Sequence, residues 1–349
     1  MTVTRRRFLK SAVALPFSGA ASRPALSSPR PAALLRGVSL AGADFGQLVP
    51  GQLGRDYIYP GSADFKFCAG QGFNAVRLPF RWERLQPDAG NPFDPDEWRQ
   101  ITAAIGSARS LGLSLILDPH NYARRRIRDD DYTADHMIGS KAVPVSAFTQ
   151  FWSELARRTK ADTHVVYGMM NEPAGIDATL WLGVANATLA AIRDTGARQL
   201  VLVPGVAWTG AHSWYAAGNT VLEGIKDPAD NFAIEVHQYL DGNSSGSSGA
   251  AVSETIGAER LQAFQGWARE RKFKAFLGEF GAGRDALALK ALENMVREVE
   301  NNRDVWIGWT AWAAGPWWPD NDPLRLSPDS NGKIPPQTKL LSGIARAAP

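Results

Sequence analysis

Short apolar runs alternate with longer amphipathic stretches along most of this chain. Eight runs rich in Val, Ile, Leu and aromatic residues have the length and composition of buried strands. They are Leu34–Leu40, Ala75–Phe80, Leu113–His120, Val165–Asn171, Gln199–Pro204, Phe232–Tyr239, Ala275–Glu279 and Val305–Trp312.

The intervals between these runs have helical spacing. In Pro95–Leu111, the residues Trp98, Ile101, Ile105 and Ala108 recur every three or four positions, which predicts a helix with one apolar face. The other predicted helices are Pro144–Lys160, Leu180–Thr195, Ala258–Arg271, Asp285–Asn301 and Pro336–Ala347. The stretch after the fifth strand shows no clear pattern.

Strand and helix alternating eight times predict a parallel α/β sheet. Eight such units in roughly 310 residues favour a single-domain (β/α)8 TIM barrel, which typically needs about 250 residues plus insertions. We therefore assign residues 31–349 to one domain, since no linker divides the chain after residue 35. A doubly wound open sheet is the alternative, but no Gly-x-Gly-x-x-Gly motif follows the first strand.

The N-terminus has the pattern of an export signal. The basic stretch Arg5–Lys10 precedes a short apolar stretch, Ser11–Ala21, and then Ser-, Pro- and Ala-rich sequence. The paired arginines resemble a twin-arginine signal, so we expect residues 1–30 to direct export to the periplasm or outside the cell. A membrane anchor is the alternative, but the apolar stretch is too short to span a bilayer comfortably.

Charge and cysteine content exclude several other readings. The formal net charge is +3, and loss of the five basic residues before position 29 lowers it by five to −2. The basic pI is therefore no indication of nucleic-acid binding. The single cysteine, Cys68, permits no intramolecular disulfide and is expected to be a buried apolar residue of a helix spanning Asp64–Gly70.

Polar and aromatic residues gather where the predicted strands end. In a barrel, the carboxyl ends of all strands meet at one face, where active sites are built. The residues at these ends are Arg77, His120, Asn121, Tyr122, Asn171, Glu172, His237, Tyr239, Glu279 and Trp312. Amides and imidazoles bind hydroxyl groups and indole rings stack on pyranose rings, so this composition favours a sugar site.

Two glutamates at these ends suggest the chemistry. Glu172 and Glu279 each close an apolar run, and hydrolysis of a sugar–sugar bond uses two opposed carboxyl groups. One protonates the leaving oxygen, and the other attacks the sugar or activates water.

Simpler readings exist for several of these residues. Asn171 could only cap a helix, and a buried histidine is more often a core residue than a catalytic one. Most of the twelve tryptophans should be core, whereas Trp317 and Trp318 are expected to face sugar together with Trp312. The mixed-charge run Arg124–Asp131 is expected to be a solvated loop. No spacing of Cys or His residues supports a metal site, and no cofactor is expected.

Several motifs are similar to those of one family. They are Ala41–Gly46, Asp118–Arg124, Met170–Pro173, Val236–Asp241 and Gly308–Gly315, and the combination of Asn-Glu-Pro with His-Asn-Tyr-Ala-Arg is the most specific. The chain resembles glycoside hydrolase family 5, most closely its endo-β-1,4-glucanase (cellulase) subfamily, over Leu35 to Trp318.

The resemblance implies a (β/α)8 fold and hydrolysis with retention of configuration. It casts Glu172 as the acid/base, Glu279 as the nucleophile, and Arg77 as the residue that keeps the nucleophile ionised. Asn171 would hold the substrate 2-hydroxyl. The remaining implied site residues are His120 and His237 at the bond-breaking subsite, Tyr239 beside Glu279, Trp312 under the sugar, and Asn121, Tyr122 and Trp208 as further substrate-binding and supporting residues.

Some positions depart from the subfamily pattern. The tryptophan Trp208 follows Gly205–Ala207 rather than Asn-Asp, the loop 241–250 lacks a histidine, and Phe280-Gly281 follows Glu279. The expected substrate is cellulose or a soluble β-glucan, with β-mannan, xyloglucan or mixed-linkage glucan as alternatives on the same barrel. A non-catalytic sugar-binding barrel is the alternative from another class. We expect a monomer without stable membrane association.

Overall fold

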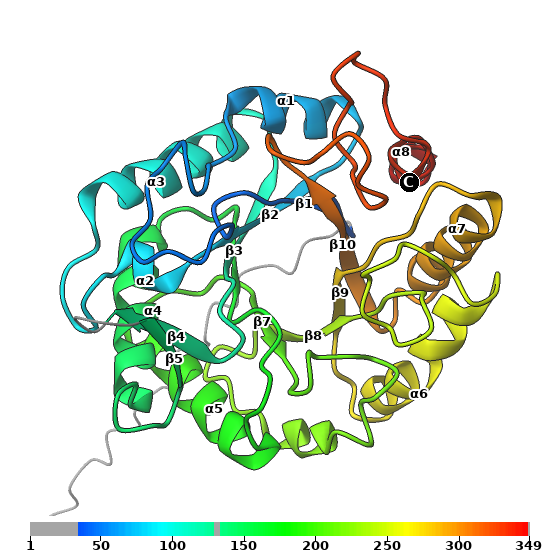
Figure 1. The fold of residues 1–349 in the computed structure, drawn as a ribbon. Coiled ribbons are helices and arrows are strands. Elements are labelled where there is room, and N and C mark those ends of the chain that lie inside the picture. The colour runs from blue at the N-terminus through cyan, green and yellow to red at the C-terminus, as the bar shows by residue number, and fades with distance from the viewer. Residues whose placement is uncertain (1–33, 129–132, 348–349) are drawn as a thin grey trace, which may run out of the picture.

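Eight parallel strands close into a barrel at the centre of the molecule (Figure 1). The structure is a computed structural model, and it describes residues 34–128 and 133–347. The predicted (β/α)8 barrel is confirmed, and each of the eight predicted strands overlaps an observed one. These are β1 (Leu35–Leu40), β2 (Ala75–Phe80), β3 (Ser114–Pro119), β6 (Val165–Gly168), β7 (Val201–Pro204), β8 (Phe232–His237), β9 (Ala275–Glu279) and β10 (Trp306–Ala314).

Helices surround the barrel and cover its outer face (Figure 1). Their bounds are α1 (Ser62–Gly70), α2 (Trp82–Leu85), α3 (Pro95–Ser110), α4 (Val145–Thr159), α5 (Ala178–Asp194), α6 (Ile256–Glu270), α7 (Ala286–Asn301) and α8 (Pro336–Ala347). Local sequence explains where two of them begin. Asp94 and Asp177 accept hydrogen bonds from free backbone N–H groups in the first turns of α3 and α5. The stretch after the fifth barrel strand, β7, which showed no clear sequence pattern, contains a short 3-10 helix, η1 (Asn219–Gly224).

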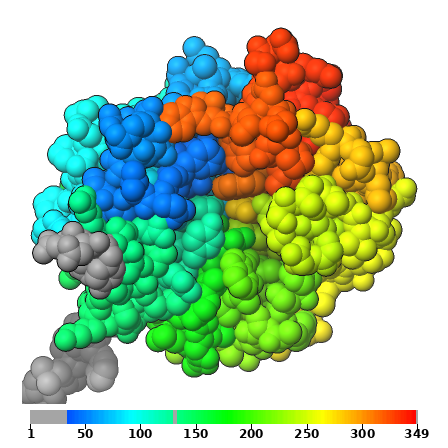
Figure 2. Space-filling view, in the orientation of Figure 1, coloured from blue at the N-terminus to red at the C-terminus, as the bar shows by residue number. Residues whose placement is uncertain are grey.

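The barrel closes where the first strand pairs with the last. β1 pairs in parallel with β10 and with β2, so segments from both ends of the described chain lie side by side (Figure 2). Gly37 lets β1 lie close to β2, because a Cβ at this position would lie 2.0 Å from the carbonyl oxygen of Ala75. The strands can approach this closely only because Gly37 has no side chain.

Large aromatic side chains fill the space between barrel and helices. Seven of the twelve tryptophans are fully buried, namely Trp82, Trp152, Trp181, Trp214, Trp267, Trp306 and Trp309. This confirms that most tryptophans belong to the core, and it leaves few that can contact a ligand. Cys68 is also fully buried within α1, as expected.

One expectation is wrong. The run Arg124–Asp131 was expected to be a solvated loop, but its described part is strand β4 (Arg124–Arg128), which pairs antiparallel with β5 (Thr133–Met137). Arg125 is buried, and its guanidinium donates hydrogen bonds to the carbonyls of Gln86 and Pro87. Arginine-rich sequence gives no local strand signal, so only pairing with β5 and these carbonyl acceptors define the element.

The expected export signal, residues 1–30, lies outside the described residues, so the signal and the domain boundary at residue 31 stay predictions. Among residues 34–128 and 133–347, the helices are too short or too polar to cross a lipid bilayer.

The close approach at Gly37 predicts a large effect of a small substitution. Gly37→Ala should lower the free energy of unfolding by roughly 1–3 kcal/mol or more, because the added methyl group overlaps the Ala75 carbonyl. Gly106→Ala in α3 is the matched control, since its Cβ would meet open space and should stabilise the protein by up to about 1 kcal/mol. Urea unfolding followed by circular dichroism measures both. Equal midpoints for Gly37→Ala and the parent protein would contradict the close packing.

Candidate active site

The predicted site residues meet at the carboxyl end of the barrel. Arg77 comes from β2, His237 from β8, Glu279 from β9 and Trp312 from β10, while Glu172 follows β6. Parallel strands in a closed barrel all end on the same side, so residues far apart in sequence become neighbours there.

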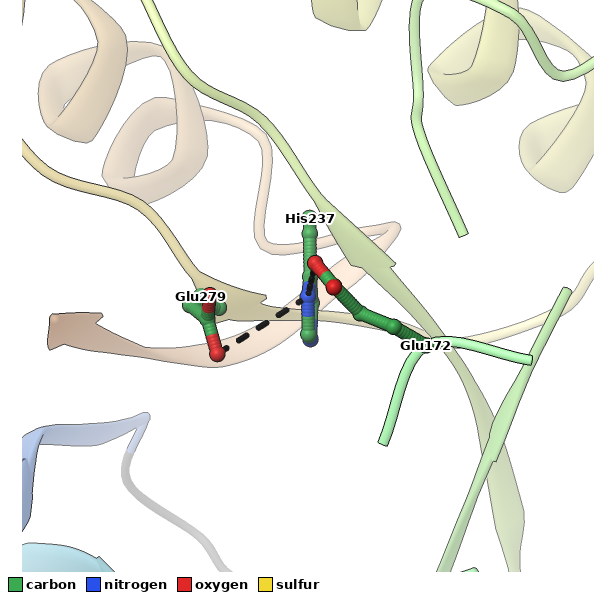
Figure 3. A group of neighbouring side chains, drawn as sticks. All are labelled: Glu172, His237 and Glu279. Atoms are coloured by element: carbon green, nitrogen blue, oxygen red, sulfur yellow. Dashed lines mark hydrogen bonds and ion pairs between the residues drawn. The ribbon is translucent and has the colours of Figure 1, made fainter. Parts of the chain in front are cut away.

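Glu172 and Glu279 lie on either side of His237 (Figure 3). The Nδ1 atom of His237 is 2.8 Å from Oε1 of Glu172 and 4.0 Å from Oε2 of Glu279. One carboxylate oxygen of Glu172, one of Glu279 and a ring nitrogen of His237 all lie within 4.8 Å of one another. This upper limit is close to the roughly 5–5.5 Å of retaining glycosidases and well below the roughly 6.5–9.5 Å of inverting ones.

Each oxygen of Glu279 receives a hydrogen bond. Arg77 Nη1 donates to Oε2 at 2.8 Å, and the Tyr239 hydroxyl donates to Oε1 at 2.8 Å. Burial by itself favours the neutral acid, but the charges of His237 and Arg77 and the Tyr239 hydrogen bond outweigh it and lower the pKa of Glu279. Glu279 is therefore held ionised and in one orientation.

Glu172 has the opposite electrostatic environment. Burial and the negative charge of Glu279 raise its pKa, while the contact with His237 only partly offsets them. Its backbone has a φ of 43°, a conformation that is uncommon for residues other than glycine. Two carboxyl groups whose pKa values are pushed apart form the arrangement that acid and nucleophile roles require.

A hydrogen-bonded layer lies beneath these groups. Arg77 Nη2 donates to Asn171 Oδ1 at 2.6 Å and lies 3.0 Å from Asp118 Oδ2. His120 Nδ1 is 2.9 Å from Asp118, and its Nε2 is 3.2 Å from Asn171 Nδ2. The carboxylate of Asp118 requires a proton on Nδ1 of His120, so Nε2 accepts from the Asn171 amide.

Aromatic rings border the acidic pair on the β10 side. Trp312 is partly exposed and stacks on His120, with ring centroids 5.3 Å apart. Trp318 packs edge-on against Trp312 and also against Phe45. Trp317, which was expected to join them, is 37% exposed. The rings of Trp312 and Trp318 therefore form one aromatic wall of the site.

A cavity of about 640 Å³ opens on the other side, next to Glu172. Tyr122 and Trp208 line it, and the Trp208 side chain is 60% exposed at the rim. His212 also lines the cavity. This cavity beside Glu172, with the exposed Trp208 ring at its rim, is large enough to hold sugar units.

The Asn121 side chain makes hydrogen bonds within the protein. It is buried, its Oδ1 accepts a hydrogen bond from the Trp82 backbone, and its Nδ2 donates to Glu83 at 2.6 Å. Both ends of the amide are engaged in joining the β2 and β3 loops. These bonds hold the loop after β3 against α2, which suits a supporting role for Asn121.

Two buried acids were not singled out from the sequence. Asp118 and Glu235 lie beside Arg77 inside the barrel, and both are at most 2% exposed. Their position inside strands β3 and β8 was the only available signal, since an acid is rarely placed in a buried strand without a charged partner.

The trio of Glu172, His237 and Glu279 is also the one group among the described residues spaced closely enough to approach a metal ion. Its donor atoms are already occupied: Glu279 binds Arg77 and Tyr239, and His237 Nδ1 contacts Glu172. A guanidinium 2.8 Å from the carboxylate would repel a cation, so this donor set suits proton transfer better than metal binding.

Comparison with known proteins agrees with this geometry. Residues 34–315 match the family described as Cellulase (glycosyl hydrolase family 5). Endo-beta-1,4-glucanase B of Aspergillus niger is 36% identical over 285 residues, which cover 81% of this chain and 82% of that protein.

Two solved structures are similar over most of the chain. An endo-beta-1,4-glucanase from Xanthomonas axonopodis pv. citri has 46% identity and a TM-score of 0.84, covering 89% of this chain and 98% of its own. A Pseudomonas stutzeri endoglucanase in complex with cellobiose has 33% identity and a TM-score of 0.80, covering 89% and 92%. With this fold, this pair of carboxyl groups and these relatives, the chain belongs to the cellulase family, glycosyl hydrolase family 5.

Proposed function

We propose that this protein hydrolyses internal β-1,4-glucosidic bonds of cellulose or soluble β-glucans, with retention of configuration. The observation that carries the proposal is the close approach of a carboxyl group with a raised pKa, on Glu172, to one with a lowered pKa, on Glu279. Retaining hydrolysis needs this difference, since one group must be an acid while the other is an anion.

In the first step, a Glu279 oxygen attacks the anomeric carbon while Glu172 protonates the departing glycosidic oxygen. The carbon–oxygen bond breaks, and an ester forms between Glu279 and the sugar. Esterification removes the negative charge of Glu279, so the pKa of Glu172 falls and it can act as a base.

In the second step, Glu172 takes a proton from water, and the resulting hydroxide attacks the anomeric carbon of the ester. Glu279 leaves as a carboxylate, which Arg77 and Tyr239 again stabilise. Two inversions at one carbon restore the original configuration.

The remaining site residues would bind the sugar chain. Because Glu172 protonates the leaving group, the cavity beside it would take the sugars on the leaving side, with Trp208 as an exposed stacking surface. Trp312 would lie under the sugar that is attacked, and Asn171 would bind its 2-hydroxyl, a hydrogen bond that strengthens in the transition state. An export signal in residues 1–30 would place the enzyme where it meets polysaccharide.

Loss of either glutamate should abolish turnover without unfolding the protein. Glu172→Ala should lower kcat by about 10²–10⁴-fold for substrates with poor leaving groups, because general acid catalysis is lost. Glu279→Ala should lower it at least as much, and azide should restore turnover in this variant with inverted product. Initial rates and product anomers by NMR measure both effects. Full activity in either variant would end the assignment.

Tyr239→Phe should move the acid limb of the pH–rate profile upward. The variant loses one hydrogen bond to the Glu279 carboxylate, so the pKa of Glu279 rises. Glu279 must be ionised to attack, and activity therefore falls off at a higher pH than in the parent enzyme. The profile of kcat/KM against pH measures the shift. An unchanged acid limb would show that this hydroxyl does not help to keep Glu279 ionised.

A panel of polysaccharides distinguishes the possible specificities. Carboxymethylcellulose should lose viscosity well before much reducing sugar appears, because cuts fall inside the chain. Mannan, xyloglucan and mixed-linkage glucan should be cleaved more slowly. Faster cleavage of one of these would assign the barrel to that substrate, and calorimetric binding of cello-oligosaccharides without any cleavage would make it a binding protein.

A further inference from the structure

Three buried polar atoms converge beneath the two glutamates without a hydrogen-bond partner. They are Nε of Arg77, Oε1 of Glu235 and Nε2 of His237. Oε1 of Glu235 is 3.5 Å from the histidine nitrogen and 3.9 Å from the arginine nitrogen. A buried carboxylate is costly unless neighbouring groups compensate its charge, so the position of Glu235 needs an explanation.

The fold leaves space for the Glu235 carboxylate. On the neighbouring strand β9, Gly278 immediately precedes Glu279, and a Cβ built on Gly278 would lie 2.0 Å from Oε1 of Glu235. Only glycine at position 278 leaves room for the Glu235 carboxylate next to Nε2 of His237. The position of Glu235 therefore depends on a second residue, and it can be disturbed without changing Glu235 itself.

His237 lies between two carboxyl groups. Glu172 faces Nδ1 at 2.8 Å, and Glu235 faces Nε2 at 3.5 Å. A neutral imidazole has one donor and one acceptor, so it could donate to only one of them, whereas the imidazolium donates from both nitrogens.

The protonation state of His237 determines which oxygen of Glu172 carries the proton. With a proton on Nδ1, the imidazole donates to Oε1 of Glu172, so the acid must carry its own proton on Oε2. With Nδ1 bare, Oε1 would instead donate its proton to the histidine, and the acid would be turned away from the glycosidic oxygen.

We propose that Glu235 is a positioning residue that keeps His237 doubly protonated, and thereby directs the transferable proton of Glu172 onto Oε2. The inference rests on the proposed function, in which Glu172 is the acid. Glu235 touches neither substrate nor reacting atoms, and it acts through the imidazole.

The charges around His237 agree with this role. Glu172 follows β6, Glu279 is on β9, Glu235 is on β8 itself, and Asp118 on β3 adds a further negative charge. Arg77 on β2 is the opposing cation. Burial favours neutral His237, but Glu279, Glu172 and Glu235 outweigh it and raise the pKa of His237 to about 10.

The test follows the protonation of His237 directly. In full-length enzyme labelled with ¹⁵N-histidine, and without substrate, both ring nitrogens of His237 should be protonated at pH 7 to 8, with His237→Asn identifying the signal among five histidines. Glu235→Gln should lower the titration midpoint by about two to three pH units, because it removes a charge close to Nε2.

A matched control separates this effect from a general loss of buried charge. Glu97→Gln removes another buried carboxylate, one held by Tyr57 and Tyr59 away from the site, and it should leave the His237 signal unchanged. Gly278→Ala should reproduce the Glu235→Gln shift, because the added methyl group displaces the carboxylate. If Glu235→Gln should fail to fold, Gly278→Ala carries the same test.

Activity supplies a second readout. Glu235→Gln should lower kcat with little change in KM. The alkaline limb of its pH–rate profile should move to lower pH, because His237 loses a proton at a lower pH in this variant. An unchanged His237 titration in folded Glu235→Gln would overturn the proposal. That outcome is distinct from failure of the proposed function, because the NMR titration needs no turnover, whereas the glutamate variants test cleavage itself.

Discussion

The whole site depends on one buried cation. The guanidinium of Arg77 is almost completely enclosed by the barrel, and it contacts the carboxylates of Glu279 and Asp118 and the amide oxygen of Asn171. Burying a charge costs several kcal/mol unless partners compensate it, and these acceptors provide that compensation. The same contacts fix where Glu279 and Asn171 point, so the requirement to satisfy Arg77 also orders the catalytic groups.

This arrangement lets two like residues perform unlike tasks. Glu279 is close to Arg77 and Tyr239, which favour its anion, whereas Glu172 is partly buried beside that anion, which favours its protonated form. The difference comes from position alone, since the side chains are chemically identical. It is also reversible, because loss of charge on one glutamate changes the pKa of the other during each catalytic cycle.

Glycines without any catalytic role make this crowding possible. Gly37 lets β1 approach β2, and Gly278 leaves room for the carboxylate of Glu235. Gly246 lies against the ring of Tyr239, where a Cβ would come within 2.4 Å. A barrel interior that holds this many charged side chains needs such gaps, because protein cores are otherwise packed to the density of organic crystals.

The sequence by itself determined the eight strands, most helices and the residues that strands deliver to the barrel mouth, since apolar runs and their polar ends are local features. Strand β4 escaped prediction because Arg124–Arg128 becomes a strand only through its pairing with β5. The sequence placed Asn121 at the end of a strand, but its hydrogen-bond partners, Trp82 and Glu83, come from another loop. Only the tertiary structure decided which carboxyl group is charged and which buried acid lies next to His237. A pKa depends on distances in space between groups, and these groups lie far apart in the sequence.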